Sequence, residues 1–264
     1  AVLRRHGVED VVMLTGHLGD RIAAHFGDGG SLGLRIRHMR EDTPLGTAGA
    51  MRAAADLLHD NFFVIYGDII FDMEMHRLAA FHAAHGAVMT PVVHPNDHPY
   101  DSDLVCVDEA GYVRAVRRKD SADKSPMRNL VNTGIYAMSR RVIDFIPPDR
   151  SVDFGLDIMP ALVAKSEAVA GYRTPEYIKD VGTLDRLRAV EHDILRGEVA
   201  RRNLAVPRPA IFLDRDGVLN IEKGEGAPPD ALELLPGAAE AVRAINKSGY
   251  LAIAVTNQPG IAKG

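Results

Sequence analysis

The chain has 264 residues, a length that favours two domains over one. Its 46% hydrophobic and 25% charged residues are typical of a globular protein, and no apolar run approaches the ~18 residues of a membrane helix. The net charge of −5 gives no basic field to attract nucleic acid or acidic membranes, so we expect neither as a partner.

Cysteine usage and local charge narrow the class of protein further. Cys106 is the single cysteine of the sequence, which excludes a disulfide framework and a thiolate metal site within it and suggests a reducing, cytoplasmic setting. The one local cluster of basic residues is Arg114, Arg117, Arg118 and Lys119, which we interpret as the solvated face of a strand.

The first two-thirds of the chain alternate between strand and helix patterns. Strands are predicted at 10–16, 34–39, 61–68, 87–93 and 129–139, a hairpin at 103–119, and helices at 17–29, 46–60, 75–86 and 182–202. The nearly continuous apolar run at 61–68 is typical of a strand buried on both faces of a parallel sheet. The alternation predicts a doubly wound, Rossmann-like α/β sheet.

The stretch 203–210 carries two prolines and no periodicity, and it predicts a domain boundary. We therefore expect a first domain at 1–202, a linker at 203–209 and a second domain at 210–264. The second region restarts the pattern, with strands at 211–213 and 250–257 around a helix at 237–249, which predicts the opening of another Rossmann-like α/β domain.

Two aspartates follow the strand in the motif IFLDRDGVLN at 211–220. Because residues i and i+2 of a strand share a side, Asp214 and Asp216 are expected to face one site while Arg215 faces away. Two carboxylates at one point repel unless a cation or a proton lies between them, and Mg²⁺ suits such a pair. A simple turn at Gly217 is the alternative, whereas the position of this glycine excludes an EF-hand.

The second predicted strand of this region also ends in polar side chains. Thr256 and Asn257 would lie beside the aspartates if the two strands are parallel neighbours, and both could donate to phosphate oxygens. The combination FLDRDGVLN…VTNQPGIAKG resembles haloacid dehalogenase-like phosphatases, above all the branch of heptose bisphosphate and histidinol phosphatases.

That resemblance implies a Mg²⁺-dependent phosphatase. Asp214 would be the catalytic nucleophile, Asp216 the general acid and base, and both would hold the metal. Thr256 and Asn257 would bind the phosphoryl group. The family also uses a lysine and further aspartates, and this branch often carries a Cys/His loop for Zn²⁺; we expect all of these beyond Gly264.

Asp68 and Asp180 each end an apolar or aromatic segment, where a turn or a helix cap is the simplest interpretation of either alone. Together with the segments PLGTAGA (44–50), VNTGIY (131–136) and DVGTLDRL (180–187), they resemble sugar-1-phosphate nucleotidyltransferases over about residues 1–200.

This second resemblance implies that Asp68 and Asp180 hold Mg²⁺ between the nucleotide and the sugar phosphate. Residues implied to bind the nucleotide are Gly46, Thr47 and Gly49, and those implied to bind the sugar are Lys119, Asn132, Thr133 and Gly134. The family's glycine-rich phosphate loop is expected ahead of Ala1. Gly155 stands where the family has a sugar-binding glutamate, and Asp153 is the nearest carboxylate.

The two resemblances combine into one hypothesis, a bifunctional enzyme of sugar-nucleotide synthesis. A phosphatase would convert a sugar bisphosphate, D-glycero-D-manno-heptose 1,7-bisphosphate, to the sugar 1-phosphate, which would receive a guanylyl group for a cell-surface polysaccharide such as lipopolysaccharide. The alternatives are a histidinol phosphatase-like hydrolase with an unrelated first domain, and a degenerate first domain that senses sugar nucleotides. Residues 1–264 alone are expected to be inactive in both reactions.

Overall fold

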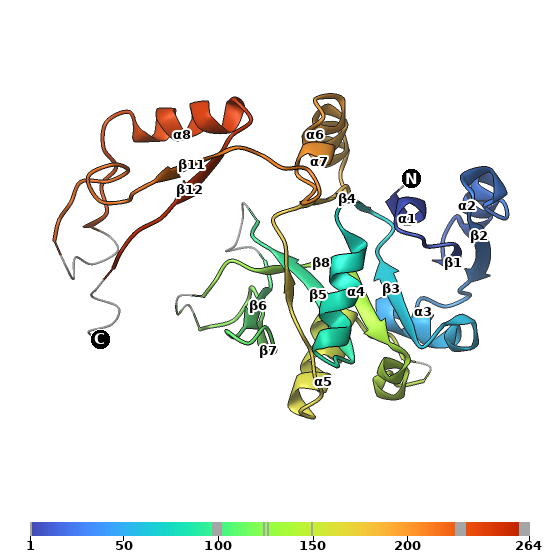
Figure 1. Cartoon of the computed structure of the whole chain (residues 1–264). Helices are drawn as coiled ribbons and strands as arrows, with labels where there is room; N and C mark the ends of the chain where they lie inside the picture. The colour runs from blue at the N-terminus through green and yellow to red at the C-terminus, as the bar shows by residue number, and fades with distance from the viewer. Residues whose placement is uncertain are drawn as a thin grey trace. The chain divides into compact units, whose positions relative to one another are not determined.

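The structure is a computed structural model that describes residues 2–96, 102–123, 125, 127–148, 150–224 and 231–258. The chain divides into two compact units, Ala1–Leu204 and Ala205–Gly264 (Figure 1). The division falls within the predicted linker at 203–209. Asn203 and Leu204 still bond to the first unit, through Asp72 at 2.8 Å and Glu176 at 3.0 Å.

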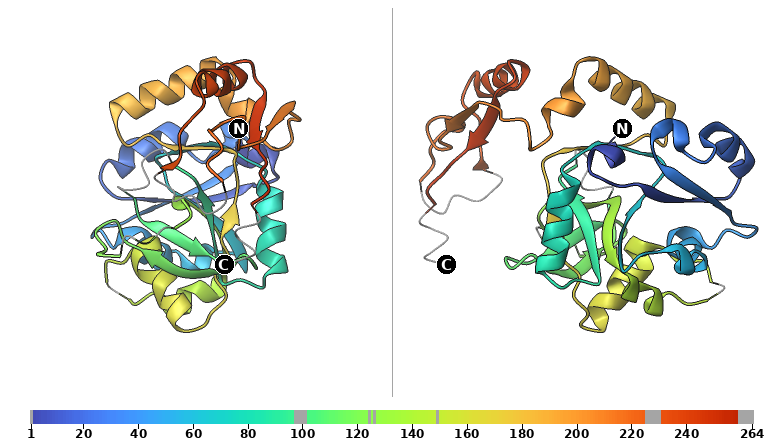
Figure 2. Two further views of the ribbon diagram at one scale, coloured as in Figure 1. Left: turned by 90° about the vertical axis from the view of Figure 1, so that its left-hand side faces the viewer. Right: turned by 45° about the vertical axis from the view of Figure 1, so that its right-hand side comes forward.

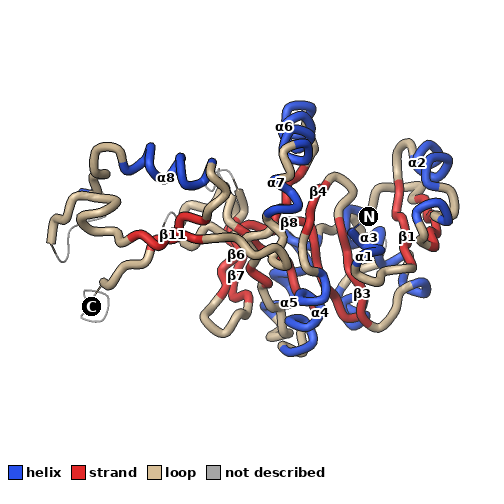
Figure 3. Tube along the Cα trace, turned by 45° about the horizontal axis from the view of Figure 1, so that its top comes forward, coloured by secondary structure: helices blue, strands red, loops and turns tan. Residues whose placement is uncertain are grey.

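The first unit alternates short helices and strands along the sequence (Figure 3). Its strands are β1 (Asp10–Thr15), β2 (Arg35–Arg40), β3 (Asn61–Ile65), β4 (Ile69–Asp72), β5 (Met89–His94), β6 (Leu104–Val107), β7 (Val113–Arg117), β8 (Val131–Ser139), β9 (Tyr172–Arg173) and β10 (Tyr177–Asp180). Its α-helices are α1 (Val2–Arg5), α2 (Gly19–Phe26), α3 (Gly46–Ala53), α4 (Met75–Ala84), α5 (Met159–Ala164), α6 (Leu184–Leu195) and α7 (Glu198–Arg201), and a π-helical turn covers Phe154–Ile158.

The central sheet is mixed and has the strand order β7-β6-β8-β5-β9, with β3 also paired to β8. The prediction of a parallel strand at 61–68 is wrong, because β3 ends at Ile65 and runs antiparallel to β8. Asn61 is exposed and the other residues of β3 are half-buried rather than fully buried. An apolar run reports burial but not strand direction, so sequence pattern alone could not distinguish the two arrangements.

Helices cover the central sheet on both faces, as the α/β prediction requires. Along β8, Tyr136 and Met138 pack into one apolar core with α3 and α5. Their neighbours Ile135 and Ala137 pack into a second core with α4, which lies along the sheet in Figure 1. The alternation follows from the two-residue period of a strand.

Two smaller strand pairs complete the first unit. β1 and β2 are parallel, and α2 packs beside β2 (Figure 2). β4 and β10 are antiparallel, with Asp180 opposite Ile69. This second pair carries Asp180 at the end of β10 and brings it to the turn that holds Asp68, the two residues for which the sequence predicts a metal-binding role.

The single helix predicted at 182–202 is instead two helices, α6 and α7. The break falls at Gly197, whose φ of 72° lies in the left-handed region and ends the helical hydrogen-bond pattern. No helix in the described part of the chain combines the length and apolar composition that a membrane crossing needs.

The second unit contains β11 (Ala210–Leu213), α8 (Ala238–Lys247) and β12 (Leu251–Ala254). β11 and β12 are parallel neighbours, with Leu213 opposite Ala254, which is the condition on which the sequence placed Thr256 and Asn257 beside the aspartates. Ala238 is the one buried apolar residue among those described in this unit, and Phe212 is 68% exposed. The unit therefore has a very small apolar core.

Candidate functional site

A cavity of about 740 Å³ opens in the first unit beside the ends of β3, β8 and β10. Residues that the sequence singles out line it together, among them Asp68, Lys119, Asn132, Thr133, Gly134 and Asp180. They come from distant parts of the chain. Antiparallel pairing of β4 with β10 and of β3 with β8 brings three of these segments to one place.

The carboxylates of Asp68 and Asp180 converge near the backbone of Gly182. A methyl group on residue 182 would lie 3.7 Å from Asp180 Oδ1 and 3.9 Å from Asp68 Oδ2. The Val181 N–H donates to the Asp68 carbonyl at 2.8 Å, which fixes the two segments side by side. These distances place the two carboxylates around one point.

This pair fits a divalent cation by the chemistry of its donors. Mg²⁺ takes oxygen ligands, and one or two carboxylates plus substrate phosphates are its usual partners in proteins. Asp180 is 44% exposed, so it can exchange its present partner for a cation without uncovering a buried charge. Asp68 and Asp180 are the residues that would hold Mg²⁺ here.

Arg186 is the present partner of Asp180, and the sequence analysis missed it. Its guanidinium, on the first turns of α6, donates to Asp180 Oδ1 and lines the cavity. Guanidinium groups bind phosphate as well as carboxylate. The signal was present in the motif DVGTLDRL, because Arg186 lies six residues after Asp180, where the first turns of a helix bring it back toward the strand end.

A chain of hydroxyl and amide groups lies at the β3–β8 side of the cavity. Asn132 Nδ2 donates to the Tyr136 hydroxyl at 2.5 Å, and the Tyr136 and Tyr66 hydroxyls are 3.3 Å apart. Burial raises the pKa of Tyr66 to about 12 and raises that of Tyr136 well above its usual value. Both phenols therefore remain neutral at physiological pH and act as hydrogen-bonding groups.

Thr133 and Gly134 have clear structural roles. The buried Thr133 hydroxyl donates to the Val92 carbonyl at 3.0 Å, and this hydrogen bond connects β8 to β5. Gly134 has a φ of 79°, and a Cβ there would lie 2.7 Å from Cδ2 of Tyr66. Glycine is therefore required for the Tyr66 ring to pack against β8. Roles in sugar binding remain predictions for both residues.

Lys119 also lines the cavity, just after β7. Its backbone N–H donates to Asp103 Oδ1 at 2.9 Å, which fixes this part of the chain. The neighbouring basic side chains are paired with carboxylates: Arg114 with Asp108, and Arg118 with Asp120. These ion pairs agree with a solvated strand face, and Lys119 is the member of the cluster that lines the cavity.

Gly46, Thr47 and Gly49 lie at the start of α3 and are not among the residues that line this cavity. A Cβ on Gly46 would meet the Val152 carbonyl at 2.5 Å, so this glycine lets the helix approach residue 152. Thr47 Oγ1 donates to Asp153 Oδ2 at 2.9 Å. Contact of these residues with a nucleotide remains a prediction. The structure shows that Gly46 and Thr47 hold α3 against residues 152 and 153.

Asp153 lines the cavity but its carboxylate is occupied. Its Oδ1 accepts from the backbone N–H groups of Gly155 and Leu156 at 2.7 and 2.9 Å, which caps the π-helical turn. With Oδ2 bonded to Thr47, little capacity remains for a sugar hydroxyl. The carboxylate therefore joins α3 to this turn.

In the second unit Asp216 lies among several donors. Both of its oxygens accept from the Arg215 side chain, at 3.1 and 2.8 Å, and Asn220 Nδ2 donates at 3.0 Å. Chiefly through the hydrogen bond from Arg215, the pKa of Asp216 falls to about 2. The prediction that Arg215 faces away is wrong, because β11 ends at Leu213 and strand alternation does not extend to these residues.

Gln258 connects the two strand ends of the second unit, and the sequence analysis did not single it out. Its side-chain amide donates to Asp216 Oδ2 at 2.9 Å and to Thr256 Oγ1 at 2.8 Å, and it lies 3.1 Å from the Asn257 carbonyl. Asp214 accepts from the Arg215 backbone N–H at 2.6 Å. The structure thus brings Asp216, Thr256 and Asn257 together, while residues 259–264 of the second motif lie outside the described residues.

Comparison with known proteins identifies the first unit. The model of the family described as "Nucleotidyl transferase" matches residues 1–197, and the chain belongs to this family. A mannose-1-phosphate guanylyltransferase of Mycobacterium tuberculosis is 31% identical over 228 residues, which are 86% of this chain and 60% of that protein. A UTP–glucose-1-phosphate uridylyltransferase of Synechocystis is 24% identical, over 80% of this chain and 58% of the relative.

Solved structures support the fold. The crystal structure of HddC from Yersinia pseudotuberculosis superposes with a TM-score of 0.62 at 19% identity, covering 73% of this chain and 82% of that one. The same protein complexed with GMP-PN gives a TM-score of 0.61. The chain spans about 60% of the length of the sequence relatives named above. The names of these two sequence relatives describe nucleotidyl transfer, and neither describes phosphate release.

Proposed function

We propose that the first unit transfers a nucleotidyl group from a nucleoside triphosphate to a sugar 1-phosphate. The observation that carries this proposal is the single cavity in which Asp68 and Asp180 converge near Gly182, with Lys119 and Asn132 on its other walls. A metal-binding pair of carboxylates and a separate polar wall are what a reaction between two phosphate-bearing substrates needs.

The reaction is a substitution at the α-phosphorus. A phosphate oxygen of the sugar 1-phosphate forms a bond to this phosphorus, the bond to the bridging oxygen breaks, and pyrophosphate leaves with the electron pair. Asp68 and Asp180 would hold Mg²⁺, which would supply positive charge to the phosphate oxygens. The side chains of Lys119 and Arg186 line the same cavity and add cationic donors for the sugar phosphate.

Guanylyl is the nucleotidyl group that we propose, and a sugar of manno configuration its acceptor. The 31% identical relative is named for GTP-derived transfer to mannose 1-phosphate, which supports both choices. D-glycero-D-manno-heptose 1-phosphate shares that configuration, and the Asp214–Asp216 motif of the second unit favours this heptose. The two acceptors differ only beyond C5, so they can be compared directly in one assay.

The experiment separates metal binding from turnover. Mn²⁺ replaces Mg²⁺ as a paramagnetic probe, and its binding to residues 1–264 is followed by electron paramagnetic resonance. Asp68→Asn and Asp180→Asn should each weaken Mn²⁺ binding about 10-fold or more, whereas Asp56→Asn, at a fully exposed carboxylate, should not change it.

Turnover is measured with the full-length protein, GTP and either sugar 1-phosphate, by release of pyrophosphate. UTP serves as the competing nucleotide. Formation of a GDP-sugar that is lost in the two aspartate variants supports the proposal. Absence of pyrophosphate with every nucleoside triphosphate and both sugars would refute it and favour a sensor of sugar nucleotides.

We propose as a second activity that the second unit contributes to a phosphatase of the haloacid dehalogenase type, with Asp214 as nucleophile. The observation that favours it is the parallel β11–β12 pair, whose ends place Asp216 and Thr256 on the same amide of Gln258. Asp214→Asn in the full-length protein should abolish phosphate release from a heptose bisphosphate or histidinol phosphate. Wild-type phosphate release by that variant would contradict the assignment.

A further inference from the structure

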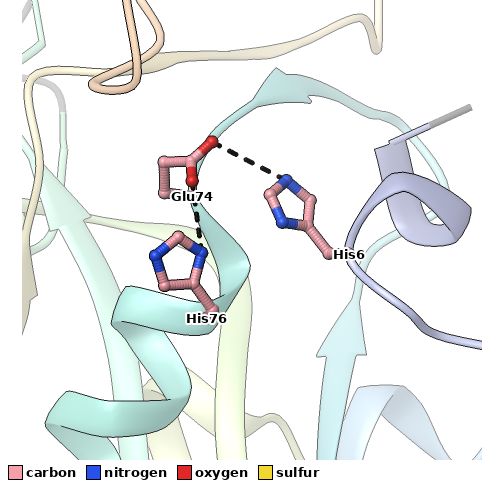
Figure 4. A group of neighbouring side chains, drawn as sticks. All are labelled: His6, Glu74 and His76. Carbon is pink, nitrogen blue, oxygen red and sulfur yellow. Dashed lines mark ion pairs between the residues drawn. The ribbon is translucent and has the colours of Figure 1, made fainter.

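Two histidines and a glutamate meet away from the cavity, at the beginning of α4 (Figure 4). His6 follows α1, whereas Glu74 and His76 begin α4. One ligand atom from each residue lies within 4.8 Å of the other two. The cluster therefore joins the N-terminal segment to the strand–helix connection after β4.

The distances approach those of a metal-binding site. His76 Nδ1 lies 3.2 Å from Glu74 Oε2, and His6 Nε2 lies 3.9 Å from Glu74 Oε1. Tetrahedral Zn²⁺ with bonds of about 2.0–2.1 Å places its ligand atoms about 3.4 Å apart. Small side-chain rotations close the remaining gap, because His76 is 67% exposed and has room to move.

His6 provides the independent sign of a ligand. Its side chain is only 8% exposed, and its Nε2 is buried with no hydrogen-bond partner among the described residues. The nitrogen points at Glu74 from 3.9 Å, which is too far for a hydrogen bond (Figure 4). A buried, unsatisfied ring nitrogen costs free energy, and a cation between it and the carboxylate would remove that cost.

Glu74 is likewise a nearly buried carboxylate, with a side chain 12% exposed and no lysine or arginine ion pair in the described part of the chain. Two other carboxylates nearby already have hydrogen-bond or ion-pair partners. Asp72 pairs with Arg5 and accepts from Asn203, and Glu176 accepts from Thr174 and two backbone N–H groups. Glu74 is the N-cap of α4, yet its carboxylate makes no capping hydrogen bond and faces the two histidines instead.

We propose that His6, Glu74 and His76 bind one divalent transition-metal ion of the Zn²⁺ class. Two imidazoles and a carboxylate suit Zn²⁺ and not Mg²⁺ or Ca²⁺, which prefer oxygen donors, and water would complete a tetrahedron. This site is separate from the carboxylate pair of Asp68 and Asp180. Its ion would fasten α1 to α4 and stabilise the N-terminal segment.

The test uses residues 1–264 and Zn²⁺ itself, with affinity measured by competition against a chromophoric chelator. We expect one Zn²⁺ per chain, and a loss of about 10-fold or more in affinity for His6→Gln and for Glu74→Gln. His59→Gln is the matched control, because His59 faces Asp10 at 4.0 Å on the surface and forms no three-residue ligand cluster among the described residues. Asp68→Asn should also retain Zn²⁺, which separates this site from the proposed catalytic one.

Two further readouts guard against misfolding of the variants. Co²⁺ in place of Zn²⁺ should give the visible absorption of a tetrahedral site, and Zn²⁺ should raise the midpoint of thermal unfolding in the wild type but not in His6→Gln. Circular dichroism checks that each variant is folded. The proposal would be overturned if folded His6→Gln or folded Glu74→Gln bound Zn²⁺ as tightly as the wild type does.

Discussion

Asp68 and Asp180 approach one point beside Gly182, although the two aspartates are 112 positions apart in the sequence. The antiparallel β4–β10 pair and the hydrogen bond from Val181 to the Asp68 carbonyl hold them there. Two negative charges held in place by backbone bonds repel each other. Arg186 offsets this repulsion at Asp180 in the present structure, and a divalent cation would do so in the proposed reaction.

Replacement of Thr47 by valine tests the link between α3 and the π-helical turn. The variant loses the bond to Asp153 and the bond that Thr47 Oγ1 accepts from the Phe154 N–H at 3.1 Å. We expect the free energy of unfolding to fall by about 1–3 kcal/mol, measured by urea denaturation. The exposed Thr43→Val is the control and should leave it nearly unchanged. Equal stability of both variants would show that this link contributes nothing.

Replacement of Gly134 by alanine tests the packing of Tyr66 against β8. The new methyl group would meet the Tyr66 ring at 2.7 Å on a backbone whose φ is 79°. We expect a loss of about 1–3 kcal/mol in the free energy of unfolding, from strain and steric overlap. Gly16→Ala, with open space around its Cβ, should be tolerated. A Gly134→Ala protein as stable as Gly16→Ala would contradict this account.

The charge of Asp216 should persist to unusually low pH. Hydrogen bonds from Arg215, which has the largest effect, and from Asn220 and Gln258 lower its pKa from 3.8 to about 2 in the folded unit. A lowered folded pKa means that the charged carboxylate stabilises the unit above pH 3.8 and that this contribution disappears as the pH falls towards 2. Carbon NMR of the carboxyl group should show this titration, and Arg215→Leu should shift it upward. An unchanged titration midpoint in Arg215→Leu would show that the hydrogen bond from Arg215 does not lower the pKa of Asp216.

The second unit should open more readily than the first. Ala238 is the one buried apolar residue among its described positions, whereas Ile135 and Met138 of β8 are fully buried between helices. Little apolar burial means a small free energy of local opening. Amide hydrogen exchange should therefore be faster in β11 and β12 than in β5 and β8. Equal protection would show that contacts other than apolar burial hold the second unit together.

The sequence predicted the order and type of most elements because apolar periodicity follows burial. It could not supply pairing partners: β3 reads as parallel from its apolar run, yet it runs antiparallel to β8. The short strands β4 and β10, which position Asp68 and Asp180, were missed because four residues are too few for a periodic signal.

The candidate site was predictable to the extent that motifs mark it. Asp68, Asn132 and Asp180 were found in separate motifs, and the structure places them around one cavity. Gln258 was missed because an isolated polar residue gives no signal until its partner is known, whereas Arg186 was missed although it lies within the motif DVGTLDRL. Gly46 was singled out as a nucleotide-binding residue, but in the structure glycine is needed there because the helix packs closely against Val152.

The central claim is that Asp68 and Asp180 act as one metal-binding pair for nucleotidyl transfer. It is tested most directly by pyrophosphate release from GTP and mannose 1-phosphate or heptose 1-phosphate in the full-length protein, comparing wild type with Asp68→Asn, Asp180→Asn and Asp56→Asn. The account predicts Mg²⁺-dependent release in wild type and Asp56→Asn, and a loss of at least ~10²-fold in each of the other two. Turnover at the wild-type rate in either Asp68→Asn or Asp180→Asn would contradict it.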